Sequence, residues 1–188
     1  MMSRDNYYGN EATDRLKYDG LYAKVDFDLH AELQTIWKNA RLEEILAKII
    51  IADLECQKSI SLCLNEFERS QLLTMGFVLT NAYPNLYNIS WLQSPKAVSA
   101  MQEYHEKLGL PSSSFQPFYS RALDLLKNSA YKNYFNVDVE LYGIGNRNKS
   151  LIAAQLKCFF RKCNLETRVH LRDTDNDNIV LCNIAWKL

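Results

Sequence analysis

The sharpest chemical pattern in this sequence lies between residues 143 and 150, which read GIGNRNKS. It matches the phosphate-loop pattern G-x-x-x-x-G-K-[ST], except that Asn148 occupies the position of the second glycine. Backbone amides of a glycine-rich turn attract phosphate, and a lysine adds positive charge. The candidate phosphate-binding residues are therefore Gly143, Gly145, Asn148, Lys149 and Ser150.

Two features argue against a nucleotide site at this loop. Asn tolerates left-handed backbone less well than the glycine that it replaces. The chain after Ser150 is also too short for the rest of a nucleotide-hydrolysing α/β fold. The plainer interpretation is a strand-to-helix turn in which Asn148 or Ser150 caps the helix, with phosphate binding as an alternative.

A second pattern is basic and follows the loop. Alternating residues of one predicted strand carry positive charge or imidazole, and further basic residues lie on the helix before it. Asp138 and Glu140 share the face of the strand residues if the two strands are neighbours, and cross-strand ion pairing is then the plainer explanation of the pattern. The candidate nucleic-acid-binding residues of this alternative are Arg147, Lys149, Lys157, Arg161, Arg168, His170 and Arg172.

Other motifs indicate neither a metal nor a cofactor. The run of Asp residues at 173–178 lacks the Gly and the Glu of a calcium loop, and its composition favours a hairpin turn. Cys158, Cys163 and His170 lack the spacing of a zinc site. Since no catalytic motif is recognisable either, we expect a protein without enzymatic activity, cofactor or metal.

Aromatic residues gather in two polar settings. Tyr7 and Tyr8 lie in a polar N-terminal arm, and Tyr83, Tyr87 and Trp91 lie in a segment that reads as a connector between helices. Tyr and Trp are enriched at protein interfaces, so these five residues are the candidate partner-binding residues. For the connector, folding over the core is an equal alternative.

The bulk properties indicate an ordinary globular chain. The 188 residues carry 22 basic and 22 acidic side chains, which gives no basic excess of the kind that marks a general nucleic-acid binder. The odd number of cysteines, five, favours free thiols in a reducing compartment. The polar N-terminus and the short apolar runs predict a soluble intracellular protein without membrane insertion.

The periodicity of apolar residues predicts the elements. Helical spacing covers 28–64, 65–81, 94–108 and a segment that opens near Pro117. After Asn136 the period becomes two, which predicts a strand, a helix at 150–163, and strands at 165–172 and 179–186. The fold class is therefore α+β, with a mostly helical N-terminal part and a small C-terminal β-α-β-β unit.

Three segments follow from this order: the arm (1–25), the helical part (26–135) and the β-α-β-β unit (136–188), the last two as separate domains or as one. The function expected from these features is that of a structural or interaction protein, a subunit of a larger protein assembly. A nucleic-acid-binding module and a phosphate-ligand or nucleotide-binding protein are the two alternatives.

Overall fold

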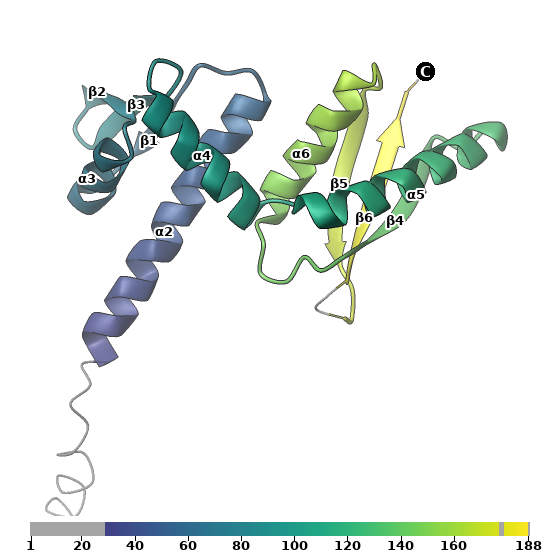
Figure 1. Cartoon of the computed structure of the whole chain (residues 1–188), viewed down its shortest axis with the longest axis horizontal. Coiled ribbons are helices and arrows are strands. Elements are labelled where there is room, and N and C mark those ends of the chain that lie inside the picture. The colour runs from purple at the N-terminus through teal and green to yellow at the C-terminus, as the bar shows by residue number, and fades with distance from the viewer. Residues whose placement is uncertain (1–28, 177–178, 188) are drawn as a thin grey trace, which may run out of the picture. The chain divides into compact units, whose positions relative to one another are not determined.

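The computed structural model describes residues 29–176 and 179–187 (Figure 1). Met1–Trp37 and Lys38–Leu188 form two units, each described by itself. The predicted arm, with Tyr7 and Tyr8, lies outside the described residues. The α+β class and the C-terminal β-α-β-β unit are confirmed, whereas a domain boundary near residue 135 stays a prediction.

Helix α2 spans Leu29–Leu54, and from Leu42 onward its apolar side chains are buried or half-buried, as their spacing predicts. The predicted continuation to residue 64 is wrong. Cys56 has a left-handed backbone (φ 62°), and the amide of Gln57 donates to the carbonyl of Ala52 at 2.9 Å, which closes the helix. The strand β1, Ser59–Cys63, follows, because alternating residues there suit a strand.

The second predicted helix is also shorter than expected. Helix α3 spans Glu66–Thr74, and Gly76 ends it with a φ of 90° that only glycine adopts easily. Strand β2, Val78–Tyr83, then turns through Pro84 and Asn85 into strand β3, Leu86–Ser90. The three strands pair antiparallel in the order β1-β3-β2, so the N-terminal part carries a small sheet where helix and connector were predicted.

Helices α4 and α5 follow the first sheet. Helix α4 spans Pro95–Leu108, with Ser94 accepting from the amide of Ala97 at 3.2 Å, as its cap residues predict. Helix α5 spans Ser112–Tyr131, so it begins five residues before Pro117 rather than near it. The proline therefore lies inside the helix, although sequence reasoning took it as the start.

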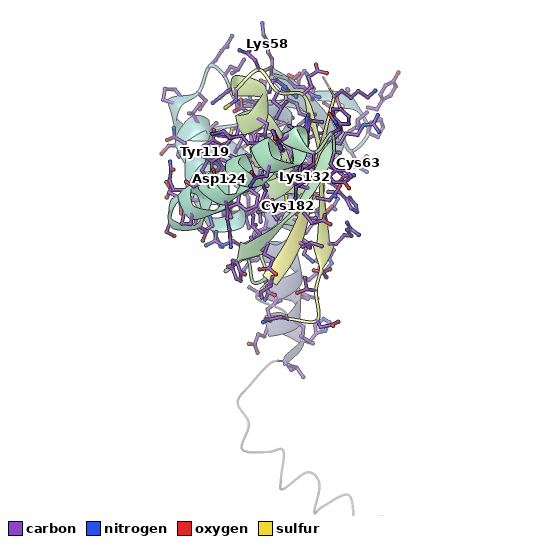
Figure 2. The ribbon with its side chains drawn as sticks, turned by 90° about the vertical axis from the view of Figure 1, so that its right-hand side faces the viewer. Lys58, Cys63, Tyr119, Asp124, Lys132 and Cys182 are labelled. Atoms are coloured by element: carbon purple, nitrogen blue, oxygen red, sulfur yellow. The ribbon has the colours of Figure 1, made fainter. Side chains whose placement is uncertain are left out.

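The C-terminal unit contains β4 (Asn136–Tyr142), α6 (Lys149–Lys162), β5 (Thr167–Asp173) and β6 (Ile179–Trp186). The strands are antiparallel in the order β4-β6-β5, so the first and second strands are separated by the third. Inward residues of the sheet share one core with residues of α5 and α6 (Figure 1). Cys182 lies in this core, and burial raises the pKa of its thiol to about 12 (Figure 2).

The two parts of the chain repeat one topology. In each, a helix precedes a strand, a helix and two further strands, and the last strand pairs between the first two. The helices between the first two strands differ in length, with nine residues in α3 and fourteen in α6. No sequence repeat accompanies this similarity, which explains why periodicity alone did not indicate it.

Glu68 anchors the start of α3 and is the only charged side chain buried among the described residues. Its carboxylate accepts from the amide of Asn65 at 2.8 Å and from Nε of Arg41 at 3.2 Å. The Asn65 side chain accepts in return from the amide of Glu68, which completes the predicted capping box. One side chain thus joins α2 to the first turn of α3.

Replacing this carboxylate leaves a helix-start amide without its acceptor and removes one of the two carboxylates that pair with Arg41, the other being Glu44. We expect Glu68→Ala to lower the free energy of unfolding by about 1–3 kcal/mol, measured by urea denaturation. Glu66→Ala, on the exposed side of the same turn, is the control and changes it by less than about 0.5 kcal/mol. Equal effects of the two variants would show that the capping box is not what stabilises α3.

Candidate functional site

The loop between β4 and α6 binds the C-terminal end of α4. Nη1 of Arg147 donates to the carbonyl oxygens of Glu106 at 2.7 Å, and of Lys107 and Gly109 at 2.8 Å. The amide of Asn148 donates to the carbonyl oxygen between them, that of Leu108, at 2.9 Å. Four consecutive carbonyl groups at a helix end, which lack partners within the helix, are thereby satisfied.

This arrangement places every candidate phosphate-binding residue. Gly143 and Gly145 have left-handed backbones, with φ of 72° and 53°. Asn148 caps α6 by accepting from the amide of Leu151 at 3.0 Å, so the predicted cap is confirmed. Lys149 pairs with Asp173, and Ser150 is exposed in the first helical turn. Phosphate binding at this loop stays a prediction. Asn148 and Lys149 already have partners within the protein.

The sheet divides the basic residues between its two faces. Arg168, His170 and Arg172 project from β5 on the face opposite the core, whereas Lys157 and Arg161 are exposed on α6, which packs against the core face. The sequence predicts one surface for all of these basic residues, but the structure places them on opposite sides of the sheet. Nucleic-acid binding stays a prediction, now for the open face of the sheet alone.

The open face is bipolar rather than basic. Strand β4, at one edge of the sheet, carries Asp138 and Glu140. Strand β5, at the other edge, carries the basic residues, and β6 lies between them. The condition set for cross-strand pairing, that β4 and β5 are neighbours, is not met, yet Nη2 of Arg172 still reaches Oδ1 of Asp138 at 3.4 Å across β6. Asn183 of the middle strand donates to the same oxygen at 2.8 Å. Ion pairing across the sheet, the alternative explanation, is thus observed.

The aromatic connector lies mostly in the core. Trp91 is 1% exposed and donates from Nε1 to Asp53 at 2.8 Å. Tyr87 is buried, and its hydroxyl accepts from Nη1 of Arg69 at 2.7 Å. Burial leaves neither side chain available to a partner, so folding over the core is the correct alternative for both. Tyr83, at the hairpin end, is exposed and remains a candidate contact.

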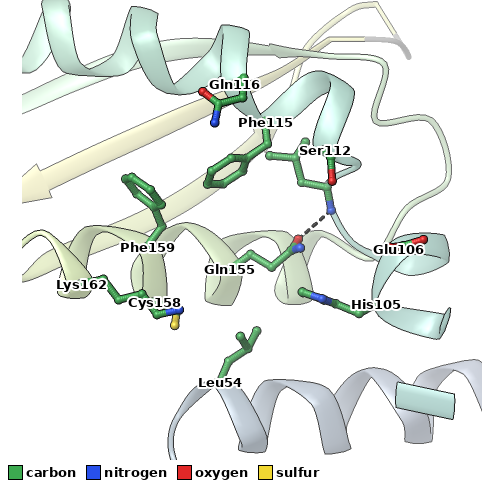
Figure 3. A pocket seen from close by; sticks show the side chains of 11 residues that line it. Leu54, His105, Glu106, Ser112, Phe115, Gln116, Gln155, Cys158, Phe159 and Lys162 are labelled. Atoms are coloured by element: carbon green, nitrogen blue, oxygen red, sulfur yellow. Dashed lines mark hydrogen bonds between the residues drawn. The ribbon is translucent and has the colours of Figure 1, made fainter. Parts of the chain in front are cut away.

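A cavity of about 400 Å³ opens where α4, α5 and α6 meet the end of α2 (Figure 3). Its inner wall is apolar, with Leu110 fully buried and Phe115 and Phe159 half-buried and edge-to-face at 5.2 Å between ring centroids. Its rim carries the exposed side chains of Glu106 and Lys162. A volume of this size falls within the range of small-molecule sites.

Two polar side chains lie deeper in this cavity. Oε1 of Gln155 accepts from the amide of Leu110 at 2.6 Å. Nε2 of His105 is buried and has no hydrogen-bond partner in the described part of the chain. Burial lowers the pKa of His105, against the opposing influence of the Glu106 and Asp53 carboxylates. Burial therefore favours the neutral form of this imidazole.

The first turns of α2 expose an apolar stripe that sequence analysis did not single out. Leu29, Leu33, Ile36 and Trp37 are each 55–60% exposed. Their spacing places them on one side of a helix, within an arc of roughly 100°. The sequence carries the signal as apolar residues three and four apart within the predicted helix over 28–64.

The described residues hold neither a metal-binding cluster nor a membrane-spanning helix. No cluster of three or more His, Cys, Asp or Glu side chains there is arranged to hold a metal ion. Within the same residues, no helix combines the length and the apolar character that crossing a bilayer requires.

The cap of α4 gives Arg147 a structural role that a substitution can test. Arg147→Met should lower the free energy of unfolding by about 2–3 kcal/mol, because carbonyl groups at the helix end lose a charged donor. Urea denaturation measures the change, with Arg161→Met on the exposed side of α6 as the control, expected below about 0.5 kcal/mol. An Arg147→Met protein as stable as the control would contradict this role.

His105 should make stability depend on pH. Its folded-state pKa lies below the unfolded value of about 6.5, so the unfolded chain takes up the proton first and stability falls as pH drops below that value. We expect the free energy of unfolding to decrease less between pH 7.5 and 5.5 in His105→Leu than in the wild type. Denaturation at both pH values measures this, and identical decreases would refute it.

Comparison with protein-family models, with curated proteins and with solved structures finds no match to this chain.

Proposed function

We propose that this protein is a non-enzymatic interaction protein that joins a larger protein assembly through the apolar stripe of α2. The observation that carries the proposal is the exposure of Leu29, Leu33, Ile36 and Trp37 on one side of the helix. Large apolar side chains are costly to leave in water, and a cluster of them marks a surface that a partner covers. Trp is moreover the residue type most enriched among energetically dominant interface contacts.

The partner that fits this stripe is a different protein with an apolar groove. Anchors at positions i, i+4 and i+7, here Leu29, Leu33 and Ile36, are the pattern by which a single helix lies in such a groove. A coiled coil of two copies requires the pattern over three or four heptads. Here the pattern continues only to Ala40, because Glu43 occupies the next position and pairs with Lys107 at 2.6 Å.

The size of the stripe sets the expected strength of binding. Burying a large apolar side chain contributes roughly 1.5–3 kcal/mol, so removing two central anchors costs roughly 3–6 kcal/mol. Since 1.4 kcal/mol corresponds to a tenfold change in affinity, losing two anchors weakens binding by a factor of about 100 or more. A loss of affinity of this size would release the chain from its assembly at cellular concentrations.

The proposal predicts that Leu33→Gln with Ile36→Gln releases the chain from its complex. Glutamine keeps helix propensity while removing the apolar contact. The tagged chain is purified from its native cells after nuclease treatment and sized. The wild type should elute with a defined set of other proteins, and the double variant as a free chain.

The matched control is Glu32→Gln with Asn39→Gln, two exposed polar positions of the same helix that should leave the complex intact. Co-elution of the double variant with the same proteins would overturn the proposal. A wild-type complex containing only copies of this chain would instead identify self-association.

A further inference from the structure

The cavity between α4, α5 and α6 has an apolar wall and a charged rim, which indicate the kind of ligand that it binds. We propose that it binds a small monocarboxylic acid with an aliphatic or aromatic body. The carboxylate would meet Lys162, and the apolar body would lie along the inner wall formed by Leu110, Phe115 and Phe159 (Figure 3). No part of the inference depends on the α2 stripe.

The apolar wall is preformed. Phe115 and Phe159 meet edge-to-face at 5.2 Å, and Tyr119 stacks on Phe115 at 6.1 Å, so neighbouring rings hold the wall in place. A cavity of about 400 Å³ lies within the range of small-ligand sites and accommodates a body of eight to ten carbon atoms or so. Because the rings are already ordered, binding loses little side-chain entropy.

Gln155 lies toward the end of the cavity away from Lys162 (Figure 3). Its Oε1 accepts from the amide of Leu110 at 2.6 Å, which fixes the side chain in place. Gly109 is needed for this approach, because a Cβ there would lie 2.6 Å from the same Oε1. This end of the cavity is therefore ordered before a ligand binds.

The charged side chains at the rim determine the charge of the ligand and the number of its carboxylates. Lys162 forms no ion pair with any described residue, so its ammonium group is available to a carboxylate. Glu106 lies at the other end of the cavity (Figure 3). A second carboxylate at that end would be repelled, which favours a monoacid over a diacid of the same length.

The proposal is tested with three ligands of equal chain length: octanoate, 1-octanol and octanedioate. Isothermal titration calorimetry on the full chain measures each affinity. Octanoate should bind at least tenfold more tightly than either of the others, because only octanoate has one charged acceptor and an apolar end. Equal binding of octanoate and octanol, or no binding of octanoate at millimolar concentration, would overturn the proposal.

A lysine pair on α6 supplies the matched variants. Lys162→Met keeps the length of the side chain, removes its charge, and should reduce the preference for octanoate over octanol to about one. Lys157→Met changes an exposed lysine of the same helix that does not line the cavity, and should preserve the preference. A preference that survives Lys162→Met would place the carboxylate elsewhere and contradict the site.

A second readout locates the ligand. Cys158 lines the cavity and is half-buried, whereas Cys56, Cys63 and Cys163 are exposed. In a chain with these three exposed cysteines changed to Ser, saturating octanoate should slow the reaction of Cys158 with a disulfide reagent at least fivefold. An unchanged rate at saturation would show that octanoate binds outside the cavity.

Discussion

The carbonyl groups at the C-terminal end of α4 accept hydrogen bonds from outside the helix. These hydrogen bonds determine how α4, α6 and the cavity are arranged in the C-terminal half. Nη1 of Arg147 and the amide of Asn148 donate to the four carbonyl oxygens. Because Asn148 also caps α6, the end of one helix fixes the start of the other. Gln155, on the next turns of α6, then reaches the amide of Leu110, and Gly109 leaves the space for it. The cavity is the consequence of this junction.

The same junction changes how the charged residues are interpreted. Residue types that suit phosphate are used within the fold, since Arg147 caps a helix and Lys149 pairs with an aspartate. On the sheet, Arg172 bridges to Asp138 across the middle strand. The exposed apolar side chains of α2 have no such internal use in the described residues. That difference is why the proposed function relies on an apolar surface rather than on charge.

The sequence predicted the elements whose boundaries are marked by cap residues or by alternation. It missed the boundaries that depend on residues without such a local pattern. Ser94 with Pro95, Asn65 with Glu68, and the alternation in β4 all gave correct elements, because caps and pleats leave local patterns. The ends of α2 and α3 were missed, since a left-handed Cys56 is rare and Gly76 was read as helix interior. The cavity was out of reach, because Leu110, Phe159 and Lys162 meet only through tertiary packing. The α2 stripe was visible as spacing, but exposure is not a sequence property.

Site-specific photocrosslinking tests the central claim most directly, because it reports contact at a single residue in the native cell. A photoreactive amino acid at position 33, within the stripe, is compared with one at position 34, an exposed residue beside it. The account predicts a crosslink from position 33 to one defined protein other than this chain, and a much weaker one from position 34. Equal crosslinking from both positions, or none from position 33, would contradict the account.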